Sequence, residues 1–202
     1  MQLIELLTVI ALAAGSPNYP AQKSTSLAAQ GGDGHARWAD AAMAKRAARR
    51  ASEASRNAAA LVSSAVDKAE KASNDTSKSA AEGIRRAVQK AYDAAIRAER
   101  AASDAATKAT VEGKELSVKA EDAARKATLA TKEALKSADD ATRQLAQSSK
   151  EESLKAAQAT RDGLRLAAEA TREAVHAARE AADKAIDAGK GEIPRSTDPT
   201  KK

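Results

Sequence analysis

The chain has 202 residues, of which 34 are basic and 28 acidic, so its formal net charge is +6. It contains no Phe and no Cys, one Trp and two Tyr, which excludes disulfides and thiol chemistry and leaves few large side chains for an ordinary globular core. Charges of both signs are mostly interleaved, which favours a solvated surface of mixed charge over a strong field directed at nucleic acid.

The first expected element is an apolar segment, residues 1–15. Between Leu3 and Ala14 it is apolar apart from Glu5 and Thr8, and it ends in small residues of the kind that signal peptidase accepts. The segment is too short to span a bilayer as a helix. We predict a secretory signal here, with an uncleaved amphipathic start as the alternative, so secretion or entry into the endoplasmic reticulum is favoured over a cytoplasmic location.

Residues 16–34 combine Pro and Gly with Ser, Thr, Asn and Gln, a composition typical of a flexible linker, and residues 189–202 form a similar tail that we expect to be disordered. Between them, residues 35–188 contain no Pro and are rich in Ala, the strongest helix former. This region is therefore predicted to be helical. The cluster around Asn74 is its weakest point and the first choice for a turn.

The helical region repeats every eleven residues. Thirteen positions spaced eleven apart, from Ala36 to Ala168, are all small or aliphatic, and parallel columns carry residues such as Leu164. Eleven residues make three helical turns of about 3.67 residues, so the columns predict a nearly straight apolar stripe with a slight right-handed drift. The residues expected to form this apolar interaction stripe are Ala80, Ala91, Ala102, Gly113, Ala124, Leu135, Ala146, Ala157, Ala168, Leu164, Val175 and Ile186.

The expected fold is all-α. It is one very long amphipathic helix or a long helical hairpin with an alanine stripe and flexible termini, and disorder in dilute water is a further expectation. A buried alanine contributes only about 0.8 kcal/mol, whereas ordering one residue costs about 1–2 kcal/mol of backbone entropy. A fold held by this stripe is therefore expected to be marginally stable.

The charged residues support helix rather than chemistry. Acidic residues repeatedly precede basic residues by four positions, as in Asp104 and Lys108, the favourable orientation on a helix. His35 and His176 are isolated, with no second ligand at metal-binding spacing, and the glycines of residues 31–34 follow no strand. We expect neither an enzyme nor a metal or cofactor site.

Two stretches carry a family resemblance. Residues 130–138, Ala-Thr-Lys-Glu-Ala-Leu-Lys-Ser-Ala, and residues 167–176, Ala-Ala-Glu-Ala-Thr-Arg-Glu-Ala-Val-His, resemble the 11-residue repeats of group 3 late embryogenesis abundant proteins. The similarity is one of composition and covers about three quarters of the chain. It implies a non-catalytic, chaperone-like protein that becomes helical on drying and protects proteins and membranes under water stress.

Two alternatives stay open. Eleven-residue amphipathic repeats also occur in proteins that coat lipid surfaces, although a face made of methyl groups would bind lipid weakly per repeat. A structural rod or bundle is the other alternative, because alanine stripes let helices approach closely. The expected partners are weak, non-specific contacts with proteins or anionic membrane surfaces, with self-association as a further option and no specific nucleic acid.

Overall fold

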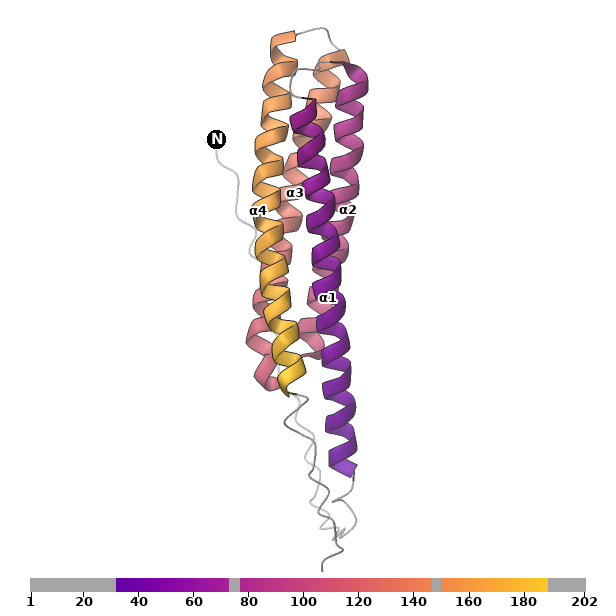
Figure 1. Cartoon of the computed structure of the whole chain (residues 1–202), viewed down its shortest axis with the longest axis vertical. Helices are drawn as coiled ribbons and strands as arrows, with labels where there is room; N and C mark the ends of the chain where they lie inside the picture. Colours follow the sequence, from indigo (N-terminus) through magenta and orange to yellow (C-terminus); the bar gives the residue numbers. More distant parts are fainter. Residues whose placement is uncertain (1–31, 73–76, 147–149, 189–202) are drawn as a thin grey trace, which may run out of the picture.

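The computed structural model describes residues 32–72, 77–146 and 150–188. Within them lie four long helices, α1 (Gly32–Lys71), α2 (Lys78–Lys108), α3 (Lys114–Ala146) and α4 (Lys150–Ala188), with a short 3₁₀ turn, η1 (Val111–Gly113), between α2 and α3. The helices run antiparallel in chain order and form an elongated four-helix bundle (Figure 1). Each helix packs mainly against two neighbours, and α4 closes the bundle against α1.

The all-α expectation is confirmed, but the finer expectation is wrong. The described chain is neither one very long helix nor a single hairpin, and it is not disordered, because four helices pack around a shared interior. An amphipathic stripe exposed along a single helix would leave its methyl groups in water. Folding the chain back three times buries them against one another.

The helix ends lie where the sequence weakens helical structure. The predicted turn at Asn74 lies outside the described residues, between the end of α1 and the start of α2. The Ser77 side chain caps α2 by accepting a hydrogen bond from the Ala80 amide at 3.2 Å. Between α2 and α3, the Gly113 amide donates to the Thr110 carbonyl at 3.0 Å, which closes the turn.

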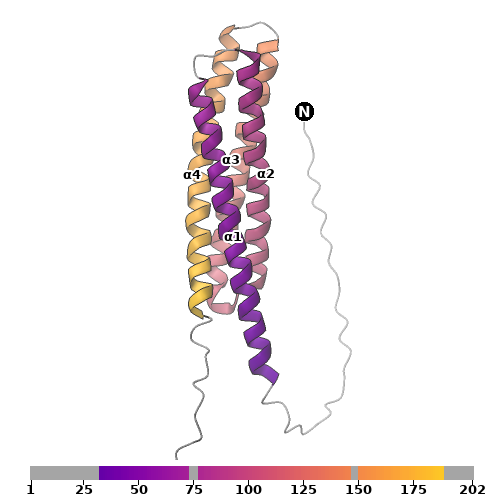
Figure 2. The same ribbon diagram turned by 45° about the vertical axis from the view of Figure 1, so that its right-hand side comes forward.

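The predicted segments 1–15 and 189–202 lie outside the described residues, as does most of the predicted linker 16–34. Helix α1 begins at Gly32, three residues before the predicted start of the helical region, and its first turns extend past the neighbouring helices at that end of the bundle (Figures 1 and 2). None of the helices in the described part of the chain is apolar over a length sufficient to cross a membrane.

Buried positions recur every seven residues in each helix, with steps that alternate between four and three. We call these positions the heptad seam. It consists of Ala44, Ala48, Ala51, Ser55, Ala58, Val62, Ala65 and Ala69 in α1, Val88, Ala91, Ala95, Ala98, Ala102 and Ala105 in α2, Ser117, Ala120, Ala124, Ala127, Thr131, Ala134, Ala138 and Ala141 in α3, and Thr160, Leu164, Ala167, Thr171, Ala174, Ala178 and Ala181 in α4. This is the spacing of left-handed helical bundles, not of a right-handed eleven-residue stripe.

The eleven-residue columns follow this seam for only part of each helix. Along the seam, successive steps of four, three and four residues add up to eleven residues. Ala91 and Ala102, which are eleven residues apart, therefore both lie on the seam of α2. The next column member within α3 after Ala124 is Leu135, which lies one position past the seam residue Ala134 and is only half-buried. In α3 the stripe therefore drifts off the interior within a single helix.

The interior is built from small side chains. Among the fully buried residues the largest apolar side chains are Leu164, Val62 and Val88, and nearly all other apolar core positions are alanine. Such a core lets helix backbones approach closely. One close approach involves Gly163, where an added Cβ would lie 3.2 Å from the Cα of Ala134 and 3.4 Å from its Cβ.

Two glycines provide a matched test of this close approach. A Cβ at Gly83 would meet nothing within 4 Å, so Gly83→Ala is expected to raise the free energy of unfolding by about 0.5–1 kcal/mol through helix propensity alone. Gly163→Ala should lower it, because α3 and α4 must move apart and overpacking costs about 1–3 kcal/mol. Urea denaturation of both variants measures the difference, and equal stabilisation by both would show that α3 and α4 are not in tight contact.

Ser55 is the one seam residue whose side chain is both fully buried and unpaired among the described residues. It is 1% exposed, and its Oγ has no hydrogen-bond partner. Ser55→Ala should raise the free energy of unfolding by about 1–3 kcal/mol, because it removes an unsatisfied buried hydroxyl. Ser52, 6% exposed on the same helix, is the control, and Ser52→Ala should gain only about 0.5 kcal/mol from helix propensity. Thermal melts of the two variants should rank in this order, and the reverse order would contradict the burial of Ser55.

Candidate functional site

The twelve residues of the predicted interaction stripe divide into three groups by burial. Ala91, Ala102, Gly113, Ala124 and Leu164 are buried. Six are half-buried, namely Ala80, Leu135, Ala157, Ala168, Val175 and Ile186, and Ala146 is exposed at the end of α3. Most of the stripe therefore lines or flanks the bundle interior. Its contact with an outside partner stays a prediction.

The fold brings several stripe residues together from different helices. Ala102 of α2 and Ala124 of α3 share one buried cluster with alanines of α1 and α4. Ala91 and Ala168 meet around Val62, and Leu164 packs in a cluster that contains Val88. The buried residues of the stripe thus contact one another across the bundle, so these residues can reach another surface only when helices separate.

Buried threonines are the main feature of the interior that sequence reasoning missed. The Thr128, Thr131 and Thr160 hydroxyls donate to the carbonyl four residues earlier in their own helices, at 3.1, 2.6 and 2.8 Å. Thr171 makes the same bond to Ala167. A hydroxyl satisfied within its own helix is buried at little cost and needs no partner across the bundle. The signal available in the sequence was the eleven-residue spacing of Thr160 and Thr171.

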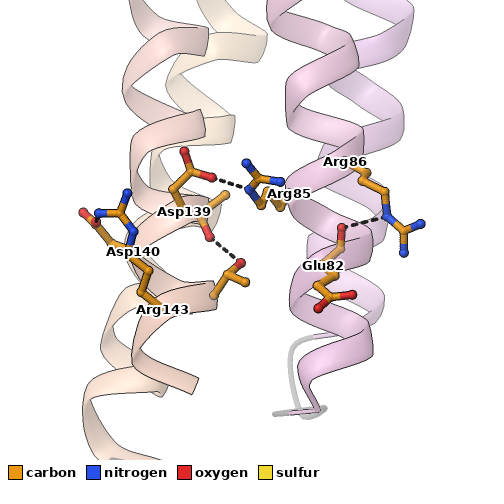
Figure 3. Close-up of polar contacts among 8 residues, drawn as sticks. Glu82, Arg85, Arg86, Asp139, Asp140 and Arg143 are labelled. Carbon is orange, nitrogen blue, oxygen red and sulfur yellow. Dashed lines mark hydrogen bonds and ion pairs between the residues drawn. The ribbon is translucent and has the colours of Figure 1, made fainter. Parts of the chain in front are cut away.

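Among the described residues, at least three ion pairs join neighbouring helices. Arg85 of α2 donates through Nε to Asp139 of α3, and Figure 3 shows the two side chains meeting between the helices. In the same view Arg86 bonds the carbonyl of Glu82 in its own helix. Two further pairs between helices are Glu99 with Arg125, also across α2 and α3, and Glu70 with Arg165, across α1 and α4, each at 3.7 Å.

Several of the expected pairs within helices are present. Asp104 pairs with Lys108 at 2.7 Å, Glu115 with Lys119 at 2.8 Å, Glu121 with Arg125 at 3.5 Å and Glu151 with Lys155 at 2.8 Å. The hydrogen bond from Lys119 and its positive charge lower the pKa of Glu115, and the same bond and charge raise the pKa of Lys119. Both residues are fully exposed, so these shifts describe a surface contact and not a reactive group.

One expected pair within a helix, that of Asp139 with Arg143, is replaced by contacts with other residues. Asp139 lies four residues before Arg143 but binds Arg85 of α2, and Arg143 lies 3.9 Å from Asp140 instead. The sequence gives the charge of each side chain, whereas the choice of partner depends on which helix lies alongside. The pair between α2 and α3 was therefore not foreseeable from spacing within one helix.

The described residues contain no group of three or more His, Cys, Asp or Glu side chains placed to hold a metal ion. The carboxylates lie on the outer surface, where they form ion pairs or face water. What this arrangement offers is a covered apolar interior and a charged exterior.

Comparison with known proteins identifies no relative. No family model matches the chain, and neither a curated protein nor a solved structure matches it. The resemblance to late embryogenesis abundant repeats therefore rests on residues such as 130–138 and 167–176. The function must be argued from the packing of the helices and the distribution of charge.

The pair between Arg85 and Asp139 can be tested by a double-mutant cycle. The two side chains are 49% and 32% exposed, so the coupling energy between Arg85→Ala and Asp139→Ala is expected to be about 0.2–1 kcal/mol and to fall as salt is added. Equilibrium denaturation of the four proteins of the cycle gives this energy. The same cycle on Lys78 and Glu82, 4.0 Å apart and both on α2, is the control and should give a smaller value. A coupling energy of zero between Arg85 and Asp139 would show that this pair does not help to hold α2 against α3.

Proposed function

We propose that this protein is a non-catalytic, stress-protective helical protein that shields proteins and membranes when water is lost. The observation that carries the proposal is the alanine composition of the heptad seam. Each buried methyl contributes about 0.8 kcal/mol, against about 1.5–3 kcal/mol for a buried Leu or Val side chain. Long helices are therefore held together by weak contacts per residue, and separating them costs little.

The proposed mechanism differs from that implied by the family resemblance. The helices are already formed in the structure, so drying need not create them. Water loss instead changes the packing, because the hydrophobic effect that holds the alanine faces together depends on water. The separated helices keep their internal hydrogen bonds, lay their alanine faces on apolar client surfaces and present charged side chains to polar ones.

Two features of the helices suit this role. Their outer faces carry Lys, Arg, Asp and Glu, which form hydrogen bonds to polar surfaces in place of water. Their inner faces are small and uniform, so they fit many client surfaces without a specific pocket. The expected contacts are weak and non-specific, as the sequence predicts for the partners of this chain.

The alternatives place different demands on the same helices. A lipid-surface coat requires the alanine faces to enter the acyl region, where methyl groups contribute less than the Leu and Phe of strong lipid-binding helices. A structural rod requires the closed bundle to be the working state. Protection by opening requires that a more stable bundle protects less, and this requirement separates the proposal from the rod.

The test dries an enzyme that loses activity on drying, with and without this protein, and measures the activity after rehydration. The wild-type protein should preserve more activity than an unrelated protein at equal mass. The stabilised variant with Ser55→Ala and Gly83→Ala should protect less, and Leu164→Ala, which costs about 2–5 kcal/mol of stability, should protect at least as well as the wild type. Absence of protection by the wild type would reject the function, and equal protection by all variants would reject the opening mechanism.

A further inference from the structure

We propose that two copies of this chain form a dimer by exchanging helical hairpins. In the dimer the turn between α2 and α3 straightens, so that α2, η1 and α3 become one continuous helix. The α1–α2 hairpin of each copy then packs against the α3–α4 hairpin of the other, which builds the four-helix bundle twice. This inference concerns the folded chain in water and does not depend on the protective role proposed above.

Two backbone torsions separate the turn from a continuous helix. Ala109 has φ −66° and ψ 139°, and Thr110 has φ −64° and ψ 162°. Both φ values already suit an α-helix, so only the two ψ angles must change, to about −42°. Residues Val111–Gly113 form a 3₁₀ turn, and Lys114 has helical values of φ −60° and ψ −48°. No Pro stands in this stretch to prevent the change.

Straightening replaces the bonds that close the turn. In the closed form the Gly113 amide donates to the Thr110 carbonyl, and the Lys114 ammonium group donates to the Ala106 carbonyl. In a continuous helix the Gly113 amide donates to Ala109, and the Ala106 carbonyl accepts from the Thr110 amide. Joining the helices also supplies partners to the last carbonyls of α2 and the first amides after it, which a separate helix leaves without partners of its own.

Small residues continue the heptad seam through the turn. Ala109 and Gly113 connect the seam residues Ala105 of α2 and Ser117 of α3 in equal steps of four. Residues three or four apart share one face of a helix. The straightened helix therefore keeps a face of small residues along its whole length, and this face can pack on a helix of another copy.

The ion pairs between α2 and α3 share one antiparallel register. Arg85 pairs with Asp139, and two heptads closer to the turn Glu99 pairs with Arg125. An exchange of hairpins keeps this register, because α2 of one copy takes the place of α2 of the other. Both pairs of opposite charge are therefore retained in the dimer, where they join different copies.

The same register gives the dimer a contact that a single copy lacks. Two heptads beyond the pair of Glu99 with Arg125, it sets Gly113 opposite Val111. These residues lie two positions apart in one turn, so they can face each other across two helices only when the helices belong to different copies. In the closed form Val111 is 95% exposed. Glycine leaves room for a valine side chain, so the dimer covers an apolar group that the closed form leaves in water.

Three features favour the closed form in dilute solution. Thr110 and Val111 are β-branched and form helix weakly. The register places the Glu112 carboxylates of the two copies opposite each other at the midpoint of the dimer, where they repel. The first turns of α1 extend past this end of the bundle, so they must bend aside for the second bundle (Figure 2). The dimer is therefore expected at high protein concentration.

Sedimentation velocity tests the exchange. The wild-type protein is concentrated, warmed to just below its melting temperature so that hairpins can separate, then cooled and measured over a range of concentrations. Monomers and dimers of nearly equal helix content by circular dichroism should be present, with more dimer at higher concentration. A wild type that stays monomeric at every concentration would overturn the proposal.

Substitutions at Thr110 should shift the equilibrium in both directions. Thr110→Pro suits the closed turn, because φ at this position is that of proline and Ala109 before it is extended. Proline inside a continuous helix is strongly unfavourable, so this variant should melt as the wild type does and form no dimer. Thr110→Ala favours helix and should strengthen dimerisation about threefold per copy, or roughly tenfold per dimer. Wild-type dimerisation by either variant would show that the copies meet through another surface, which would overturn the proposal.

The contact of Val111 with Gly113 has its own test. Val111→Ala should weaken dimerisation on the order of tenfold and leave the thermal melt of the monomer unchanged, because the side chain is exposed there. The matched control is Leu129→Ala, which removes an apolar side chain, 57% exposed, from the middle of α3. The control should dimerise as the wild type does. Equal weakening by both variants would contradict the register proposed for the two copies.

Discussion

The packing of methyl groups against methyl groups along the heptad seam is the constraint on which the rest of this structure depends. An alanine interior supplies little free energy per residue, so the contact must be long, and the helices accordingly run for 31 to 40 residues. Small side chains also allow backbones to approach closely, as at Gly163 and Ala134. Close approach gains dispersion contacts that larger side chains would otherwise supply.

A uniform interior poses a second problem, which is the choice of partner and register for each helix. The buried threonines form hydrogen bonds within their own helices, so they do not favour one neighbouring helix over another. Preference comes from features at the edge of the seam. Gly163 has no side chain, so the helix that carries Ala134 can lie close beside it. The pairs of Arg85 with Asp139 and of Glu70 with Arg165 match opposite charges between particular helices. Shape and charge at the border thus compensate for the lack of distinctive side chains inside.

The sequence predicted the helices for sound local reasons, namely abundant Ala and no Pro across the helical region. It also identified the weak point near Asn74, which lies between α1 and α2. The period was misread because three steps along the seven-residue seam also add up to eleven residues, as from Ala91 to Ala102. In addition, the position of the seam in the sequence starts anew after each turn between helices. Contacts between helices, including the pair of Glu70 with Arg165, depend on which helices become neighbours and could not be read from spacing along the chain.

The distribution of charge indicates where the bundle separates most easily. Helices α2 and α3 are joined through η1 and by two pairs of opposite charges. Helices α1 and α4 lie at opposite ends of the helical region and share one such pair. Opposite charges between α2 and α3 favour closure on that side of the bundle. Separation should therefore begin between α1 and α4.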